Sequence, residues 1–350
     1  MRFMQISGFG GLLLLYLAFA FPLFYFVYKF GDPEPLAHDY FQYYHLFLGR
    51  DVSQVIAPHN MRLAGAFFVH FIYKLNLFYD TACAADKYQS WGFLKQIYFC
   101  AIFFNWLCIA LTSTLIYKVL FTEIQHRLYA FIGGLIYLLG FGTIFYCMMP
   151  LTEAFSILVF TVFLLFYRKK SYWIFAPLCV LIFQREYLLI ITATLCLLDY
   201  FKEKKLYYFW AFVLSVLAFA VHYGLRKTIF FTAHLDYHSN PSFMLHHFME
   251  PSINILEYLR QLALGLNLFF IYLVVVLVLK KRGVSIDQQA FKVLCILFLE
   301  VNLISIAGGH GNNAGRYFYL AIPLVIFALI KEIKKLVELG RNNSSLNGIN

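Results

Sequence analysis

A carboxylate and two histidines stand close together near the start of the chain, in the polar run from His38 to His45. The run follows the first long apolar segment, so we expect it at a membrane surface. A carboxylate held there among aromatic rings is partly desolvated and can accept a proton from a hydroxyl. Asp39 is therefore the candidate general base, with His38 and Tyr43 beside it as candidate substrate contacts. The alternative is that Asp39 only caps a helix N-terminus, a position that Asp favours.

Three arginines, Arg62, Arg185 and Arg316, stand at the ends of apolar segments. A guanidinium group binds phosphate through two parallel hydrogen bonds, so these residues are candidates to hold an anionic, lipid-linked substrate. The alternatives are that they anchor the chain at lipid headgroups, or that Arg185 simply pairs with its neighbour Glu186. The other candidate substrate contacts are Glu153, Glu186, His310 and Tyr317.

Two glutamates, Glu153 and Glu300, also lie at or inside the ends of apolar segments. An ionised group in that position is costly unless it is paired, and its presence favours a functional site. Arg185 and Arg316 are the candidate partners of both glutamates.

The composition predicts a membrane protein. Of the 350 residues, 62% are hydrophobic and only 13% are charged, and the mean hydropathy is +0.71. A chain of this kind cannot form one soluble core with a hydrated surface. The seven cysteines are scattered without CxxC spacing, so we predict neither a disulfide framework nor a metal cluster.

The apolar runs predict an all-α, polytopic fold with about ten membrane segments. A helix needs about 20 apolar residues to cross a bilayer, and the matching runs are 8–28, 94–120, 128–147, 206–226 and 262–279, with 290–307 and 317–330 as two more. Three shorter segments, 154–167, 172–183 and 187–198, are divided by the polar triplets at 168–170 and 184–186.

The Lys and Arg residues predict the orientation. Most of the 28 lie in loops that share one side if the N-terminus is cytoplasmic, as the positive-inside rule requires. The net charge of +10 is then a topology signal, and a nucleic-acid partner is not expected because the basic residues sit at span ends. Both termini are cytoplasmic in this arrangement, and the polar loops 29–91 and 227–258 lie outside.

The first outer loop, 29–91, is expected to carry two interfacial helices, over 38–49 and 61–78. The loop 227–258 contains several histidines without a fixed ligand spacing, so we interpret it as a flexible lid rather than a metal site. Residues 1–335 are expected to form a single transmembrane domain, and residues 336–350 a short cytoplasmic tail.

The order of these pieces resembles the GT-C superfamily of membrane glycosyltransferases. The matching motifs are two to four residues each and span most of the chain. They look like the acidic first-loop motif and the Thr-Asp, Arg-Glu and late Arg-Tyr signatures of small bacterial members: His38-Asp39-Tyr40, Arg62, Leu151-Thr152-Glu153-Ala154, Gln184-Arg185-Glu186-Tyr187 and Gly315-Arg316-Tyr317.

The resemblance implies a polyprenyl-phosphate-linked sugar as donor and a hydroxyl of a glycan, lipid or protein as acceptor. It implies that Asp39 deprotonates the acceptor, that arginines bind the donor phosphate, and that the anomeric carbon is inverted. The active site would face outward from the bacterial inner membrane. The chain departs from the family in having Glu153 where Asp is more usual and in lacking an Asp-x-Asp pair, so no cofactor or divalent metal is expected.

Three alternatives follow from the same residues. A glycan polymerase or ligase of the same fold would use lipid diphosphate donors. A transporter or lipid flippase would place polar groups near the membrane midplane and show a repeat between its halves. A membrane acyltransferase would need an intramembrane histidine, for which His70 and His222 are candidates. The glycosyltransferase reading predicts that Asp39, Glu153, Arg185 and Arg316 meet beside a lipid-sized opening.

Overall fold

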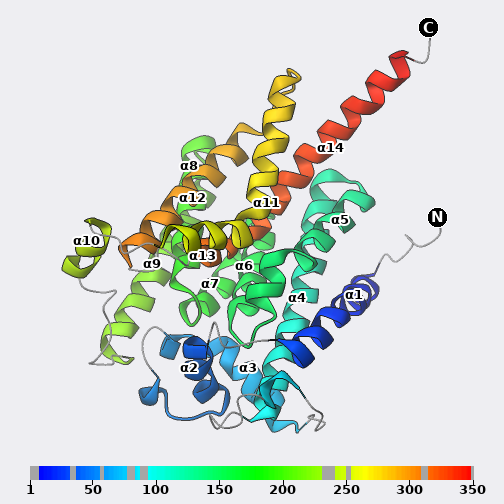
Figure 1. The fold of residues 1–350 in the computed structure, drawn as a ribbon. Helices are drawn as coiled ribbons and strands as arrows, with labels where there is room; N and C mark the ends of the chain where they lie inside the picture. Colours follow the sequence, from blue (N-terminus) through cyan, green and yellow to red (C-terminus); the bar gives the residue numbers. More distant parts are fainter. Residues whose placement is uncertain are drawn as a thin grey trace.

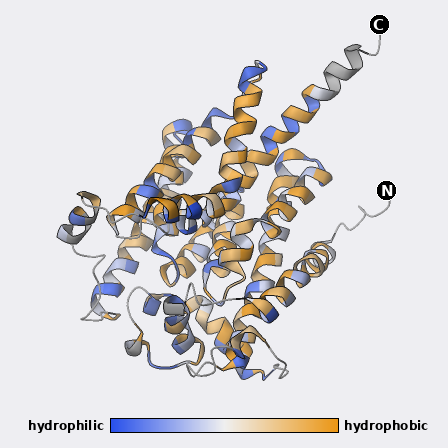
Figure 2. Cartoon of the chain, in the orientation of Figure 1, coloured by the Kyte–Doolittle hydropathy of each residue, from blue (hydrophilic) through white to orange (hydrophobic). Residues whose placement is uncertain are grey.

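The computed structural model describes residues 8–31, 37–55, 59–76, 83–86, 94–230, 241–249, 254–308 and 314–347. Over these residues every regular element is a helix and there is no strand (Figure 1). The prediction of an all-α fold is confirmed for this part of the chain. The long helices are apolar along their length and hydrophilic mainly at their tips and around the centre of the bundle (Figure 2).

The helices follow the predicted apolar runs closely. The α-helices are α1 (Phe9–Phe30), α2 (Ala37–Phe47), α3 (Leu63–Lys74), α4 (Lys95–Ile124), α5 (Arg127–Leu138), α6 (Glu153–Arg168), α7 (Phe175–Ile182), α8 (Glu186–Glu203), α9 (Leu206–Thr228), α10 (Pro241–Met249), α11 (Ile255–Lys281), α12 (Gln288–Ala307), α13 (Ala314–Tyr319) and α14 (Ile322–Asn347). Short 3-10 helices cover Val52–Gln54, His59–Met61 and Tyr172–Ile174, and Thr143–Cys147 forms a π-helix.

Five of these helices, α1, α4, α9, α11 and α12, are long and apolar enough to cross a membrane. They make the chain compatible with an integral membrane protein, while the expected total of about ten segments stays a prediction. Two predicted spans are interrupted. The segment 128–147 breaks after α5, where Gly142 packs so closely on Tyr319 that a Cβ would lie 2.3 Å from its ring.

The predicted span 317–330 is divided between α13 and α14. Pro323 is the second residue of α14. A proline has no backbone N–H to donate and its ring collides with the preceding turn, so it is tolerated in the first turn of a helix but not within one. The break after Tyr319 therefore lies where the sequence permits a new helix to start.

The two ends of the bundle carry different structures. The short helices α2 and α3 lie at one end of the molecule, and the connections from α4 to α5, α8 to α9 and α11 to α12 lie toward the other (Figure 1). Because α6 and α8 run from the first end to the second, their first residues face α2 and α3. This arrangement brings the beginnings of several helices together.

Two glycines fix the contact between α11 and α13. A Cβ on Gly315 would lie 1.9 Å from the backbone oxygen of Gln261, and one on Gly265 would lie 2.2 Å from the backbone oxygen of Gly315. Only glycine permits backbones to approach this closely. The contact places the next residue, Arg316, inside the bundle, where its side chain is buried.

Candidate functional site

Glu153 lies at the centre of a buried group of charges. Its Oε1 atom accepts hydrogen bonds from Arg185 Nη2 and from Arg316 Nη2 and Nε, the last at 2.7 Å. Glu153 and Arg185 each expose only 2% of their surface. The predicted pairing of Glu153 with these two arginines is confirmed. Glu300 does not share it, because its Oε1 accepts a hydrogen bond from Thr194 Oγ1 at 2.9 Å instead.

Asp39, which lies near the start of the chain, belongs to the same group of charges. Its Oδ2 accepts a hydrogen bond from Arg316 Nη1 at 2.7 Å, and its Oδ1 lies 3.1 Å from His59 Nε2. The Asp39 side chain is 22% exposed, against 2% for Glu153. Asp39 is therefore the carboxylate of this group that a molecule from outside can reach.

Arg62 and Glu186 form a second pair beside the first group. Arg62 Nη2 lies 3.8 Å from Glu186 Oε1, and Arg62 Nη1 donates to the Tyr43 hydroxyl. The alternative in which Arg185 pairs with Glu186 is wrong. Arg185 is the extended residue that precedes α8 and Glu186 is the first residue of that helix, so their side chains leave the backbone in different directions. We call Asp39, Arg62, Glu153, Arg185, Glu186 and Arg316 the charged cluster.

Helix starts place most of the charged cluster. Glu153 and Glu186 are the first residues of α6 and α8, where the helix dipole and the free N–H groups favour a carboxylate. Asp39 is the third residue of α2, within the first turn. The proposal that Asp39 acts as the N-cap is therefore wrong, because the helix already includes the two residues before it.

The other predicted contacts are placed as follows. The Tyr317 and Tyr187 rings lie against each other with centroids 4.5 Å apart, and Tyr43 is fully buried. His38 lies on α2, but its side chain is outside the described part, and His310 and most of the polar stretch 231–253 are also outside it.

His59 is a site residue that the sequence did not reveal, because a lone histidine in a polar loop has no diagnostic spacing. Burial lowers the pKa of His59 well below its usual range, and the nearby Arg62 guanidinium lowers it further, against the opposing effect of Asp39. The imidazole is therefore neutral at neutral pH. With Asp39 ionised, the imidazole tautomer that carries its proton on Nε2 donates it to Asp39 Oδ1.

The histidines of the acyltransferase alternative have other contacts. His70 Nδ1 lies 2.9 Å from the backbone oxygen of Phe47, and His222 Nδ1 lies 2.6 Å from that of Ile182. Each imidazole thus binds a backbone carbonyl group. The Glu186 carboxylate lies close enough to His222 to interact with it electrostatically.

Several buried donors near the charged cluster have no acceptor among the residues that the structure describes. They are Arg62 Nε, Arg185 Nε and Gln184 Nε2. Glu153 Oε2 is a buried acceptor in the same condition. Buried polar groups are nearly always hydrogen-bonded, so unsatisfied ones call for an explanation such as water or a ligand. Glu186 Oε2 is another such acceptor, while the three donors are suited to an anionic group.

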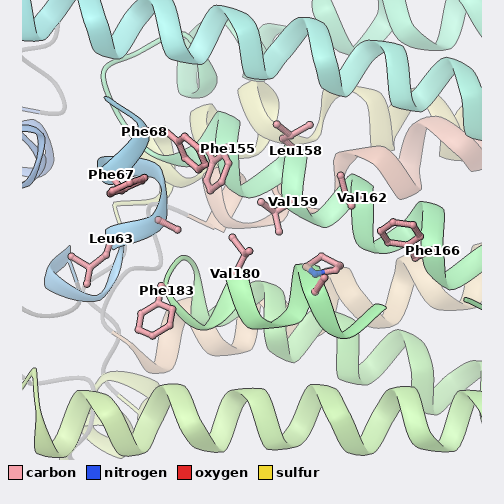
Figure 3. Close-up of a pocket in the computed structure, with 13 residues that line it drawn as sticks. Leu63, Phe67, Phe68, Phe155, Leu158, Val159, Val162, Phe166, Val180 and Phe183 are labelled. Atoms are coloured by element: carbon pink, nitrogen blue, oxygen red, sulfur yellow. The ribbon is translucent and has the colours of Figure 1, made fainter. Parts of the chain in front are cut away.

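An apolar cavity of about 600 Å³ adjoins the charged cluster. Its walls come from α3, α6 and α7, and Figure 3 shows side chains of α6 and α7 facing each other across it. All the lining residues are apolar: Leu63, Ala64, Phe67, Phe68, Phe155, Leu158, Val159, Val162, Phe166, Ala176, Pro177, Val180 and Phe183. We call this cavity the groove.

The groove and the charged cluster are continuous in sequence and in space. Phe155 and Phe183 of the groove stand within two residues of Glu153 and Arg185. The backbone N–H of Ala64 also donates to the carbonyl oxygen of Phe183 at 3.2 Å, which joins the start of α3 to the end of α7. One end of the groove therefore lies beside the arginines.

The charged cluster contains three guanidinium groups and three carboxylates. Within the described ranges, no three His, Cys, Asp or Glu residues are grouped so that they could hold a metal ion.

Comparisons with protein-family models, with curated proteins and with solved structures find no match for this chain. The chemistry of the site must therefore be argued from its own residues.

Proposed function

We propose that the protein is a GT-C-type membrane glycosyltransferase that moves a sugar from a polyprenyl-phosphate donor to an acceptor hydroxyl. The observation that carries the proposal is the meeting of Asp39, Glu153, Arg185 and Arg316, which come from four distant segments of the chain. A buried set of charges costs stability unless it is well paired. Its position beside an apolar groove suits a ligand with a charged head and a long apolar tail.

The donor would lie with its lipid chain in the groove and its phosphate at the arginines. The groove is within the size range of ligand pockets, about 300–1,000 Å³, and it presents only apolar walls to the chain. The unsatisfied Nε–H groups of Arg62 and Arg185 are donors that phosphate oxygens can accept from. Glu153 would hold Arg185 and Arg316 in place before the donor arrives.

Asp39 would act as the general base. It takes the proton of the acceptor hydroxyl as the oxygen forms a bond to the anomeric carbon, and the bond from that carbon to the phosphate oxygen breaks on the opposite face. The electron pair stays with the lipid phosphate, whose charge the arginines stabilise. Attack and departure on opposite faces invert the anomeric carbon.

The Lys and Arg distribution supports an outward-facing site. The charged cluster lies at one end of the bundle, and the connections between helices that are richest in Lys and Arg lie toward the other end. Together with the resemblance, it favours the bacterial inner membrane, with both termini in the cytoplasm. The acceptor is a hydroxyl of a glycan, lipid or protein.

The test is transfer of a labelled sugar from a polyprenyl-phosphate donor in membranes that contain the protein. Asp39→Asn keeps the shape of the side chain and removes the base, so we expect transfer to fall about 100-fold or more. Asp51→Asn is the matched control, because Asp51 lies in the same loop region, is exposed and accepts a hydrogen bond from the neighbouring Ser53 N–H. Folded Asp39→Asn protein with parental activity would refute the assignment of the base.

A glycan polymerase or ligase of the same fold would require a lipid diphosphate donor. Measuring sugar transfer from monophosphate and diphosphate donors in parallel distinguishes the two functions. Transfer from neither donor, by protein that is folded and inserted, would refute the glycosyltransferase proposal as a whole.

A further inference from the structure

A second cavity, of about 350 Å³, lies at the opposite ends of the helices that carry the charged cluster. Glu153 begins α6 and Arg168 ends it, so a rise of 1.5 Å per residue separates the two sites by about 20 Å. Unlike the groove, this cavity has charged walls. We call it the basic-end cavity, because it lies where the Lys- and Arg-rich connections of the bundle gather.

Its charged residues come from four helices. Glu123 is the penultimate residue of α4, Arg168 ends α6, Asp199 lies in the last turns of α8, and Lys331 lies on α14. A smaller adjoining cavity of about 140 Å³ shares Arg168, Asp199 and Lys331 as walls. The two cavities are therefore neighbours that share these side chains as a common wall.

Two cations share one carboxylate in this cavity. Arg168 Nη1 pairs with Glu123 Oε1, and Lys331 Nζ lies 2.5 Å from Glu123 Oε2. The three groups together carry one net positive charge. The Arg168 guanidinium also lies 4.4 Å from the centre of the Phe327 ring, which fixes its orientation.

The other carboxylate of the cavity is bound by neutral donors. Asp199 Oδ2 accepts a hydrogen bond from the Tyr167 hydroxyl at 2.8 Å, and Oδ1 accepts a longer one from Gln289 Nε2 at 3.4 Å. Its charge, and that of Asp287 on the wall of the smaller cavity, still act on Arg168 and offset part of the positive charge of the site. Lys169 adds a third cation to the wall.

We propose that the basic-end cavity binds a phosphate-bearing ligand through Arg168 and Lys331. Its volume suffices for a small ligand or a lipid headgroup, and the side chains of Arg168 and Lys331 are 27% and 34% exposed, so both can be reached. Glu123 holds the two cations together when the ligand is absent. The ligand is a free phosphate compound or the headgroup of an anionic lipid.

The proposal predicts opposite effects for two substitutions. Lys331→Gln removes a cation and should weaken binding about tenfold, the loss expected for one charge-assisted hydrogen bond. Glu123→Gln removes the competing carboxylate and should tighten binding several-fold. A purely structural ion-pair network would give no such opposition, because both changes would only destabilise the helices.

The experiment measures the affinity of the full-length protein in detergent for three probes: inorganic phosphate, short-chain phosphatidylglycerol and short-chain phosphatidylcholine. Each variant is compared with and without the probe, so a lower intrinsic stability of the variant affects both measurements equally and drops out of the comparison. Lys335→Gln is the matched control, since Lys335 lies on the same helix and pairs with Glu332 at 3.0 Å but does not line the cavity.

Binding of phosphate with the opposite effects of the two variants supports a free phosphate ligand, and the same pattern with phosphatidylglycerol alone supports a lipid headgroup. Binding that Lys331→Gln and Glu123→Gln leave unchanged, or that both weaken, overturns the proposal. So does a failure of both inorganic phosphate and phosphatidylglycerol to bind, or equal binding of phosphatidylcholine.

Discussion

At the scale of single residues, the site depends on one carboxylate that serves two arginines. Glu153 Oε1 accepts from both Arg185 and Arg316, and Arg316 in turn reaches Asp39. Burying one ion pair rarely gains stability, but removing one member of it leaves an uncompensated charge. The arrangement is therefore sensitive to the loss of Glu153 and fixes the position of Asp39 indirectly.

Glu153→Gln should destabilise the protein by about 3–5 kcal/mol, because two buried guanidinium groups lose their common counter-charge. Denaturant unfolding in detergent, followed by tryptophan fluorescence, measures the change. Glu338→Gln is the control, since Glu338 is 55% exposed and lies 3.7 Å from Lys334, and an exposed pair contributes at most about 1 kcal/mol. Equal stability of the two variants would show that Glu153 is not needed for the fold.

At the scale of elements, the site is assembled from helix ends. α2, α6 and α8 contribute residues of their first turns, and α13 contributes Arg316 because two glycines let it approach α11. The short length of α13 matters, since a six-residue helix has little packing of its own. Its glycine contact with α11 is reinforced by the Phe318 ring, which packs on Phe269 of α11 and Phe298 of α12.

Gly315→Ala should disturb both stability and activity. The added Cβ would lie 1.9 Å from the Gln261 oxygen, so α13 must shift, at a cost of about 1–3 kcal/mol, and Arg316 must move with it. The control, Gly340→Ala, adds a methyl group that meets nothing within 4 Å on helix α14, and should be neutral or slightly stabilising. Thermal unfolding and sugar transfer by both variants are the measurements, and a silent Gly315→Ala would contradict the close contact.

At the scale of the whole molecule, the bundle joins an apolar groove to a charged cluster. The groove is lined by α3 at the cluster end and extends between α6 and α7 (Figure 3). This combination suits a molecule with a charged head and an apolar tail. The basic-end cavity, at the other end of the bundle, is lined in part by residues of α6 and α8. These two helices also carry residues of the charged cluster.

Val162→Trp tests the occupancy of the groove, because it places a large ring among the residues that line it. We expect the KM for a long-chain polyprenyl-phosphate donor to rise about tenfold or more, and that for a short-chain analogue to change little. Val216→Trp, on an exposed position of α9, controls for the added ring. An equal effect on long and short donors would place the lipid chain elsewhere.

The sequence by itself determined the fold class and most of the helices, because the length of an apolar run is a local property, while the breaks within 128–147 and 317–330 were not predicted. It also singled out Asp39, Glu153, Arg185 and Arg316, since ionised groups at the ends of apolar segments are costly and stand out.

The sequence also indicated Arg185 and Arg316 as candidate partners of Glu153, but the other contacts of the site were decided by the tertiary structure alone. Glu186 binds Arg62 rather than Arg185, and His59 lies beside Asp39, although nothing in their spacing indicates it. Long-range pairing depends on how helices pack, and the contact of Gly315 with α11 fixes Arg316 only in three dimensions. The groove likewise exists only where α3, α6 and α7 meet.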